Sequence, residues 1–162
     1  MVNRSRPHVL VLPEDYANDQ LLTGFLLEFD NPRQVQALEA AGGWRAVLDR
    51  FNSNEASGMD RYPDRLMVLL LDFDGRSNRL AQVQAAIPKH LTDRVFVLGA
   101  WTEPEDLRRA NLGSYEAIGR SLANDCRHNA NTTWEHELLR HNAYELARFC
   151  ARARPILFPD SD

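Results

Sequence analysis

The chain has 162 residues, of which 44% are apolar and 26% charged, a size and balance typical of one globular domain with one substantial core. Its formal net charge is -4, from 19 basic and 23 acidic residues. This balance excludes a histone-like protein that binds nucleic acid by overall charge alone. Lys89 is the only lysine, which excludes most mechanisms that need a Schiff-base or phosphate-binding lysine, although arginine can still clamp a phosphate.

The two cysteines, Cys126 and Cys150, fall in segments with helical patterns, and neither has a second Cys or a His at metal-ligand spacing. We expect reduced core thiols of the kind found in cytosolic proteins. The chain begins without an apolar stretch of signal-peptide length, and no apolar run approaches the roughly 18 residues that a membrane span needs. The sequence therefore predicts a cytoplasmic protein that does not interact with a membrane.

Three continuous apolar runs predict the strands of a sheet, at residues 8–13, 66–71 and 94–99. Unbroken apolar runs, rather than alternating ones, are typical of parallel strands that are buried on both faces. A last apolar run at residues 155–158 suggests a short fourth strand, and the polar stretch 52–63 suggests an exposed loop.

Helical periodicity and capping signals alternate with these runs. The expected helices cover residues 18–29, 32–52 with an interruption at Gly42-Gly43, 78–87, a segment opened by a capping box at 102–105, 114–126, and 132–152. Asn31 is expected to cap the second of them, with Pro32 in its first turn.

Strands that alternate with helices indicate an α/β fold, a Rossmann-like three-layer sandwich with a mainly parallel central sheet and helices on both faces. We expect one domain over residues 1–162. Its C-terminal helical portion, about 114–153, could be part of that domain, a small appendage or an oligomer surface.

Acidic residues follow all three predicted strands. Glu14 and Asp15 follow the first, Asp72 and Asp74 follow the second, and Glu103 follows the third. In an open parallel sheet, ligands bind at the carboxyl ends of the strands, so these acids are expected to converge on one edge. Close carboxylates repel each other unless they are protonated or neutralised by a cation, and Mg²⁺ prefers oxygen ligands. The acids predict a magnesium site, although any one of them could instead be a helix cap or a turn residue.

Two basic features could contact a phosphate near such a site. Arg76 directly follows the acids of the second strand and is predicted to bind substrate. In the last predicted helix a ridge at steps of four could track a nucleic-acid backbone, or could form a solvated face paired with the acidic ridge beside it; its members are Arg140, Tyr144, Arg148 and Arg152.

A strand that ends in Glu14, followed by a helix and a later strand that ends in Asp72-Phe73-Asp74, resembles the Toprim domain of topoisomerases, bacterial primases and related nucleases. The resemblance covers residues 8–110. It implies a Rossmann-like fold, Mg²⁺ or Mn²⁺ bound by Glu14, Asp72 and Asp74, phosphodiester cleavage or transfer, and an acid/base role for Glu14. Glu103 is similar in place to a further Glu of the nuclease branch. The chain departs from the family pattern at Asp15, where glycine is common.

Two other families share parts of this pattern. Residues 9–27 resemble the opening of a two-component receiver domain, whose phospho-acceptor would be Asp72, but the receiver's lysine is missing. The run 72–75 resembles the nucleophile motif of haloacid-dehalogenase phosphatases, although Arg76 stands where that family has Thr or Val.

Two functions follow from the sequence. The first is a Mg²⁺-dependent, nuclease-like protein that cleaves phosphodiesters in nucleic acid, as a subunit of a defence or DNA-processing system. Glu14, Asp72 and Asp74 would be its catalytic residues. The alternative is a non-catalytic, receiver-like or Toprim-like interaction module that forms a homodimer or binds a protein partner.

Overall fold

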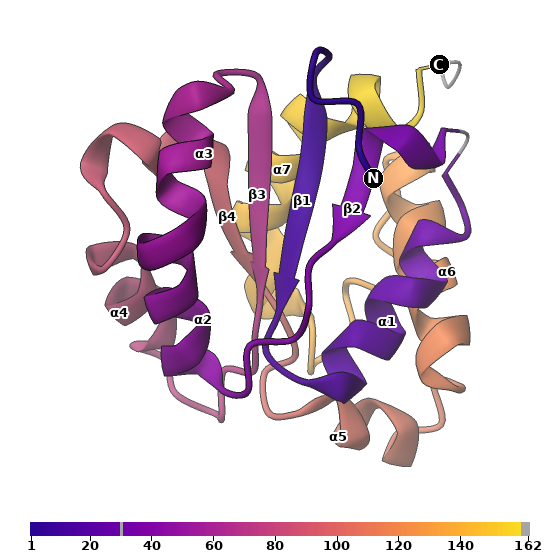
Figure 1. Ribbon diagram of the computed structural model, residues 1–162. Coiled ribbons are helices and arrows are strands. Elements are labelled where there is room, and N and C mark those ends of the chain that lie inside the picture. Colours follow the sequence, from indigo (N-terminus) through magenta and orange to yellow (C-terminus); the bar gives the residue numbers. More distant parts are fainter. Residues whose placement is uncertain (30, 160–162) are drawn as a thin grey trace.

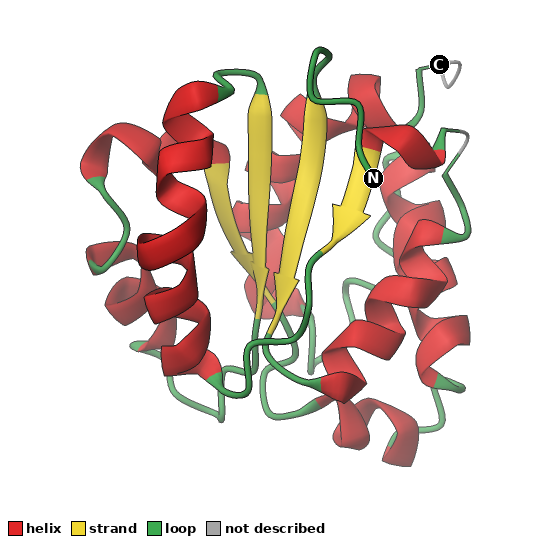
Figure 2. Cartoon of the chain, in the orientation of Figure 1, coloured by secondary structure: helices red, strands yellow, loops and turns green. Residues whose placement is uncertain are grey.

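A computed structural model describes residues 1–29 and 31–159 of the protein. Four parallel strands form its central sheet, in the order β2-β1-β3-β4, with helices on both faces (Figures 1 and 2). The strands are β1 His8–Pro13, β2 Val35–Ala37, β3 Arg65–Leu70 and β4 Val95–Leu98. The prediction of an α/β, Rossmann-like three-layer sandwich is therefore confirmed.

The side chains of each strand alternate between the two faces of the sheet. In β1, Val9 and Val11 pack into one core layer, whereas Leu10 and Leu12 pack into the other. β1 lies between β2 and β3 and pairs with β3 over its full length, from His8 opposite Arg65 to Pro13 opposite Leu70. Burial on both faces explains why the run 8–13 is apolar throughout.

Two groups of helices cover the sheet (Figure 1). The first layer contains α1 Tyr16–Leu26, α5 Pro104–Arg109, α6 Tyr115–His128 and α7 Ala143–Leu157. The second contains α2 Trp44–Arg50, a π-helical turn Phe51–Glu55, α3 Ala56–Arg61 and α4 Arg79–Ala85. The C-terminal helices α6 and α7 are thus part of the layer that packs on the sheet.

The second predicted helix is wrong in its first half, because the chain enters the sheet there. The side chain of Asn31 accepts a hydrogen bond from the backbone N–H of Arg33, as expected for a cap, but only a single 3-10 turn follows, Pro32–Gln34. The edge strand β2 comes next, and it pairs with β1 over three residues. So short a strand carries no apolar run that would distinguish it from a helix.

Two other predictions are also wrong. The polar stretch 52–63 is mostly helical rather than a loop, because Phe51 and Met59 are fully buried and anchor its inner side. The apolar run 155–158 is not a strand. It ends α7, where Leu157 and Phe158 are buried in the core, and the helix expected from residue 132 begins only at Ala143.

The N-terminal part of α7 covers the outer edge of β4. Asn142 accepts a hydrogen bond from the backbone N–H of Gly99 at 3.1 Å and donates one to the carbonyl of Gly99 at 2.9 Å, so its amide replaces a neighbouring strand. The buried carboxylate of Glu145 accepts from the N–H of Val97 at 3.0 Å. An open strand edge is a template for pairing with other chains, and here side chains close it.

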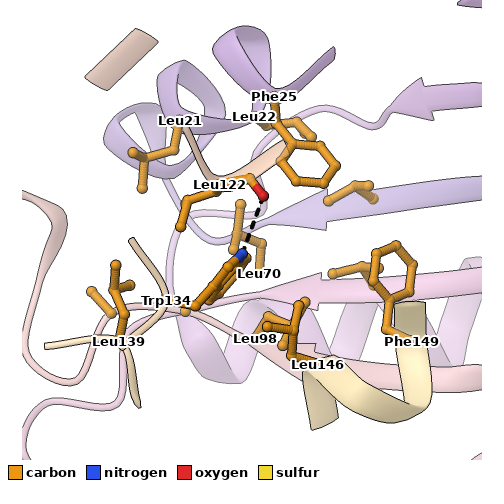
Figure 3. A pocket seen from close by; sticks show the side chains of 14 residues that line it. Leu21, Leu22, Phe25, Leu70, Leu98, Leu122, Trp134, Leu139, Leu146 and Phe149 are labelled. Atoms are coloured by element: carbon orange, nitrogen blue, oxygen red, sulfur yellow. Dashed lines mark hydrogen bonds between the residues drawn. The ribbon is translucent and has the colours of Figure 1, made fainter. Parts of the chain in front are cut away.

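An apolar cavity of about 70 Å³ remains inside the first layer. Figure 3 shows hydrophobic side chains from α1, α6, α7 and the sheet around it, and the indole N–H of Trp134 donating to the carbonyl of Leu122 at 3.1 Å. Apolar cavities of this kind stay dry, so it belongs to the core rather than to a site for a polar substrate.

A buried histidine joins β1 to β3 at the amino end of the sheet. The ring of His8 donates from Nδ1 to the carbonyl of Arg6 at 2.8 Å, and its Nε2 accepts from Nε of Arg65 at 2.9 Å. Arg65 is 4% exposed, and its guanidinium lies over the ring of Tyr62, 4.6 Å from the centroid. Only the neutral imidazole can accept this hydrogen bond from an arginine.

Acidification is expected to destabilise the protein through His8. Burial, together with the charges of Arg65 and Arg4, lowers the pKa of His8 below its ordinary 6.5, against the opposing effects of the Arg6 carbonyl and Asp64. Below pH 6.5 the unfolded chain therefore takes up a proton that the folded protein does not. The free energy of unfolding then decreases as the pH is lowered, by at most about 1.4 kcal/mol per pH unit, until the pH reaches the pKa of folded His8.

Urea unfolding of the wild type and of His8→Gln, at about pH 8 and about pH 5, measures this effect. Glutamine can still accept from Arg65 but does not titrate, and the other ionisable groups are common to both proteins. The wild type should lose more stability than the variant on acidification. Equal losses would show that His8 is not held neutral by the fold.

Within residues 1–29 and 31–159, no helix combines the length and the apolar character that a membrane crossing requires.

Candidate metal site at the carboxyl edge of the sheet

The ends of β1 and β3 place two acids side by side. Glu14 directly follows β1, and its N–H continues the sheet by donating to the carbonyl of Leu70 at 2.8 Å. The backbone N–H of Asp72, two residues after β3, donates to Oε2 of Glu14 at 2.6 Å. Chain connections from β1 and β3 run to opposite sides of the sheet, so this is the switch point at which parallel sheets usually bind ligands.

A third acid joins them from the start of α1. Asp15 is the N-cap of α1 and accepts a hydrogen bond from the N–H of Asn18 at 3.0 Å. Glu14, Asp15 and Asp72 can each offer one oxygen, and these three oxygens lie within 4.8 Å of one another. Three convergent carboxylates are a donor set suited to a hard divalent cation such as Mg²⁺ or Mn²⁺.

The side chain of Asn18 connects two of these acids, Asp15 and Asp72. It is 0% exposed, and its amide nitrogen donates to Oδ1 of Asp15 at 2.9 Å and to Oδ1 of Asp72 at 3.0 Å. Its own Oδ1 has no hydrogen-bond partner among the described residues. A fully buried amide oxygen without a partner is costly, so a bound group that reaches this oxygen would stabilise the protein.

The electrostatics of the group favour a bound cation. Burial is the main reason why the pKa of Asp72 rises to about 7, and the nearby charges of Glu14 and Asp15 add to it against the hydrogen bond from Asn18. Burial likewise raises the pKa of Glu14. These carboxylates are costly to ionise without a counter-charge, so a divalent cation would bind with release of protons.

Asp74, predicted as a further ligand, lies outside the group of three acids. Its backbone has a positive φ of 52°, in a tight turn with Gly75. The carboxylate forms an ion pair with Arg79 at 2.9 Å, and the same guanidinium nitrogen donates to the carbonyl of Asp72 at 2.9 Å. Arg79 is buried against the ring of Trp44, at 4.1 Å from the centroid. Arg79 therefore holds the loop that carries both aspartates.

Phe73 anchors the same loop in the second core layer. Its ring is buried, lies 4.5 Å from that of His141, and stacks with Trp101 at a centroid distance of 6.4 Å. Burial lowers the pKa of His141 to about 4, so this imidazole is neutral at physiological pH. The two aspartates thus flank an apolar anchor, which fixes the loop next to the ends of the strands.

Two other predicted site residues lie at the protein surface. Arg76 is exposed in the turn after the acids, open to a substrate. Glu103 is half-exposed at the start of α5 and lies 3.5 Å from Arg109. The expected capping box is not formed, because the hydroxyl of Thr102 donates to the carboxylate of Asp106 at 2.6 Å instead of accepting a backbone N–H.

The basic ridge of the last helix is partly occupied by protein contacts. Arg148 forms an ion pair with Glu145 at 2.9 Å and donates to the carbonyl of Val95. Arg152 lies 3.6 Å from the carboxylate of Asp93 and donates to its carbonyl. These contacts favour the interpretation as an ion-paired face over that of a track for nucleic acid.

Asn18 and Arg79 were missed by the sequence reasoning. Asn18 stands on the same helical face as Leu21, Leu22 and Phe25, and a polar residue on an apolar face was the signal for it. Arg79 carries no such signal, because an arginine in the first turn of a predicted helix is ordinarily exposed.

The comparisons with known proteins do not indicate a function. No family model matches the chain, and neither the curated proteins nor the solved structures contain a significant match.

Proposed function

We propose that the protein is a Mg²⁺- or Mn²⁺-dependent enzyme that cleaves phosphodiester bonds, and that Glu14, Asp15 and Asp72 hold the cation. The observation that carries the proposal is the approach of these three carboxylates to within 4.8 Å at the switch point of the sheet. Asn18, which donates hydrogen bonds to Asp15 and Asp72, adds a fully buried oxygen without a hydrogen-bond partner to the same place. The resemblance of Glu14 and Asp72 to the Toprim pattern supports the same chemistry.

A bound divalent cation polarises the phosphoryl oxygens and lowers the pKa of an attacking water. Each acid of the group already uses one oxygen in a hydrogen bond from Asn18 or from the N–H of Asp72, which orients the other oxygen. The resemblance to the Toprim pattern gives Glu14 the acid/base role, in which it accepts the proton of the water.

Two arginines have separate roles in this proposal. Arg76, exposed next to the acids, binds the phosphate that precedes or follows the scissile bond. Arg79 is a positioning residue, because it contacts the carbonyl of Asp72 and the carboxylate of Asp74 rather than solvent. A net charge of -4 gives the chain no general attraction for nucleic acid, so a protein partner would supply the remaining binding surface for a long substrate. A cytoplasmic location, consistent with the two free thiols, is part of the proposal.

Calorimetric titration with Mn²⁺ is expected to show one cation site that depends on the acids. Binding should be lost in Glu14→Gln, because the amide removes a negative charge and replaces a carboxylate with a single neutral carbonyl oxygen. Asp64→Asn is the matched control, since Asp64 is exposed and lies at the opposite end of β3.

Equal binding to the wild type and Glu14→Gln would refute the site. No binding to the wild type would favour the alternative of a non-catalytic module that binds a protein or a second copy of itself.

A further inference from the structure

Two cysteines that are distant in sequence meet between α6 and α7. Cys126 is buried near the end of α6, and Cys150 is partly exposed in the middle of α7. Their sulfur atoms lie 2.6 Å apart, and both are free thiols. A disulfide has an S–S distance of roughly 2.05 Å, so the two sulfurs are close enough to bond without rearrangement of the helices.

The thiols are accessible to small molecules. A surface pocket of about 310 Å³ opens between the same helices and is lined by both cysteines. Asn129, Asn131 and Glu135, which also line it, are exposed. The pocket therefore has exposed polar residues in its lining and brings open space to both cysteines, in contrast to the closed apolar surroundings of an ordinary core cysteine.

We propose that Cys126 and Cys150 form a peroxide-sensitive modification site, which closes reversibly to a disulfide across α6 and α7. The proposal is independent of the metal site and of phosphodiester cleavage. Its oxidant is a small hydroperoxide that enters the pocket.

The chemistry takes place in two steps. The Cys126 thiolate attacks one oxygen of the hydroperoxide, the O–O bond breaks, and the sulfur is oxidised to a sulfenic acid while the other oxygen leaves as an alcohol, or as water if the oxidant is hydrogen peroxide. The sulfur of Cys150 then attacks the sulfenic sulfur. The S–O bond breaks, the S–S bond forms, and water leaves with the proton of Cys150.

The sulfurs share a hydrogen bond in which either could be the donor. We take Cys150 as the donor, an arrangement that lowers the pKa of the Cys126 thiol and raises that of Cys150. Cys126 is therefore the first nucleophile and Cys150 the resolving thiol.

The bond would stiffen the layer that supports the sheet. It would tie α7, whose Asn142 and Glu145 close the edge of β4, to α6. α6 in turn crosses α1 so closely that a side chain at Gly24 or Gly119 would meet the backbone of the other helix, at 2.0 Å from Glu116 and Leu21 respectively. Closing a loop of this length is expected to lower the unfolding equilibrium constant by about two orders of magnitude.

The test is to treat the reduced protein with a stoichiometric amount of hydrogen peroxide and to count its free thiols. The wild type should lose both thiols, become lighter by two hydrogens in the intact mass, yield a crosslinked peptide containing Cys126 and Cys150, and recover fully with dithiothreitol. In Cys150→Ser the sulfenic acid should persist on Cys126 and be captured by dimedone. In Cys126→Ser the remaining thiol should react no faster than it does in unfolded protein.

Retention of both thiols by the folded wild type, or their loss only through crosslinks between molecules, would overturn the proposal. The assignment of roles would be overturned if dimedone labelled Cys150 in the Cys126→Ser variant as fast as it labels Cys126 in the Cys150→Ser variant. The wild-type peptide map needs no variant, so it decides the matter even if Cys126→Ser fails to fold.

Discussion

Asp72→Asn is expected to abolish cation-dependent phosphodiester cleavage while the protein remains folded. Asp72 is the most buried of the three acids, with 7% of its surface exposed, and its loss removes a charged ligand from the middle of the group. Loss of a residue that only supports a metal ligand typically costs about 10- to 100-fold. Removal of the ligand itself should cost more than about 100-fold in kcat/KM, measured on a phosphodiester substrate with Mg²⁺ or Mn²⁺.

The same variant should be at least as stable as the wild type above neutral pH. Because the pKa of folded Asp72 is about 7 and its ordinary value is 3.8, the unfolded chain gives up this proton before the folded protein does. Asp72 therefore costs stability increasingly as pH rises from about 4 to about 7, and asparagine removes the cost. Thermal unfolding at about pH 5 and about pH 8 without added cation measures the difference.

Asp64→Asn is the control for the cleavage measurement, because Asp64 is exposed and lies at the opposite end of β3. Cleavage by a folded Asp72→Asn protein at the wild-type rate would refute the catalytic role. A loss of the same size in Asp64→Asn would show that activity depends on overall charge rather than on the site.

Gly99→Ala is expected to unfold the protein, or to cost more than about 4 kcal/mol, a value reached only by exceptional substitutions. Gly99 follows β4, and a Cβ there would lie 1.6 Å from the carbonyl oxygen of Leu71. The obstacle is backbone, which cannot move aside as a flexible side chain does. Relief would separate β4 from β3 and break the hydrogen bonds between Gly99 and Asn142.

Gly75→Ala is the matched control for this prediction. Gly75 also has a positive φ, of 67°, but nothing lies within 4 Å of a Cβ built on it. It should cost only the roughly 1 to 2 kcal/mol of a left-handed backbone conformation. Urea unfolding of the two variants separates the effects, and equal losses of stability would show that the chain around Gly99 can move.

The strands and the acids at their ends were predictable because both depend on local sequence. β1, β3 and β4 are buried on both faces, so each is a continuous apolar run, and Glu14 and Asp72 follow these runs directly. β2 could not be predicted, because an edge strand of three residues is defined by its pairing with β1 rather than by its own composition.

The missed parts of the site depend on contacts between distant segments. Asn18 reaches Asp72 across 54 residues, and Arg79 is buried only because Trp44 of another helix covers it. The meeting of Cys126 and Cys150 follows from the packing of α6 against α7, which hydrophobic periodicity alone cannot place. Asp74 follows a predicted strand and was therefore expected to be a ligand, whereas in the structure its carboxylate pairs with Arg79 and is not one of the three convergent acids.

The cover on β4 has a consequence for the order in which the protein forms during synthesis. All four strands are synthesised before Asn142 and Glu145. These two side chains form the hydrogen bonds to Gly99 and Val97 that a neighbouring strand would otherwise form. Until α7 docks, the nascent chain presents a sheet with an unprotected hydrogen-bonding edge, to which another nascent chain on the same message could add a strand. Docking of the last helix is therefore the step that closes this edge.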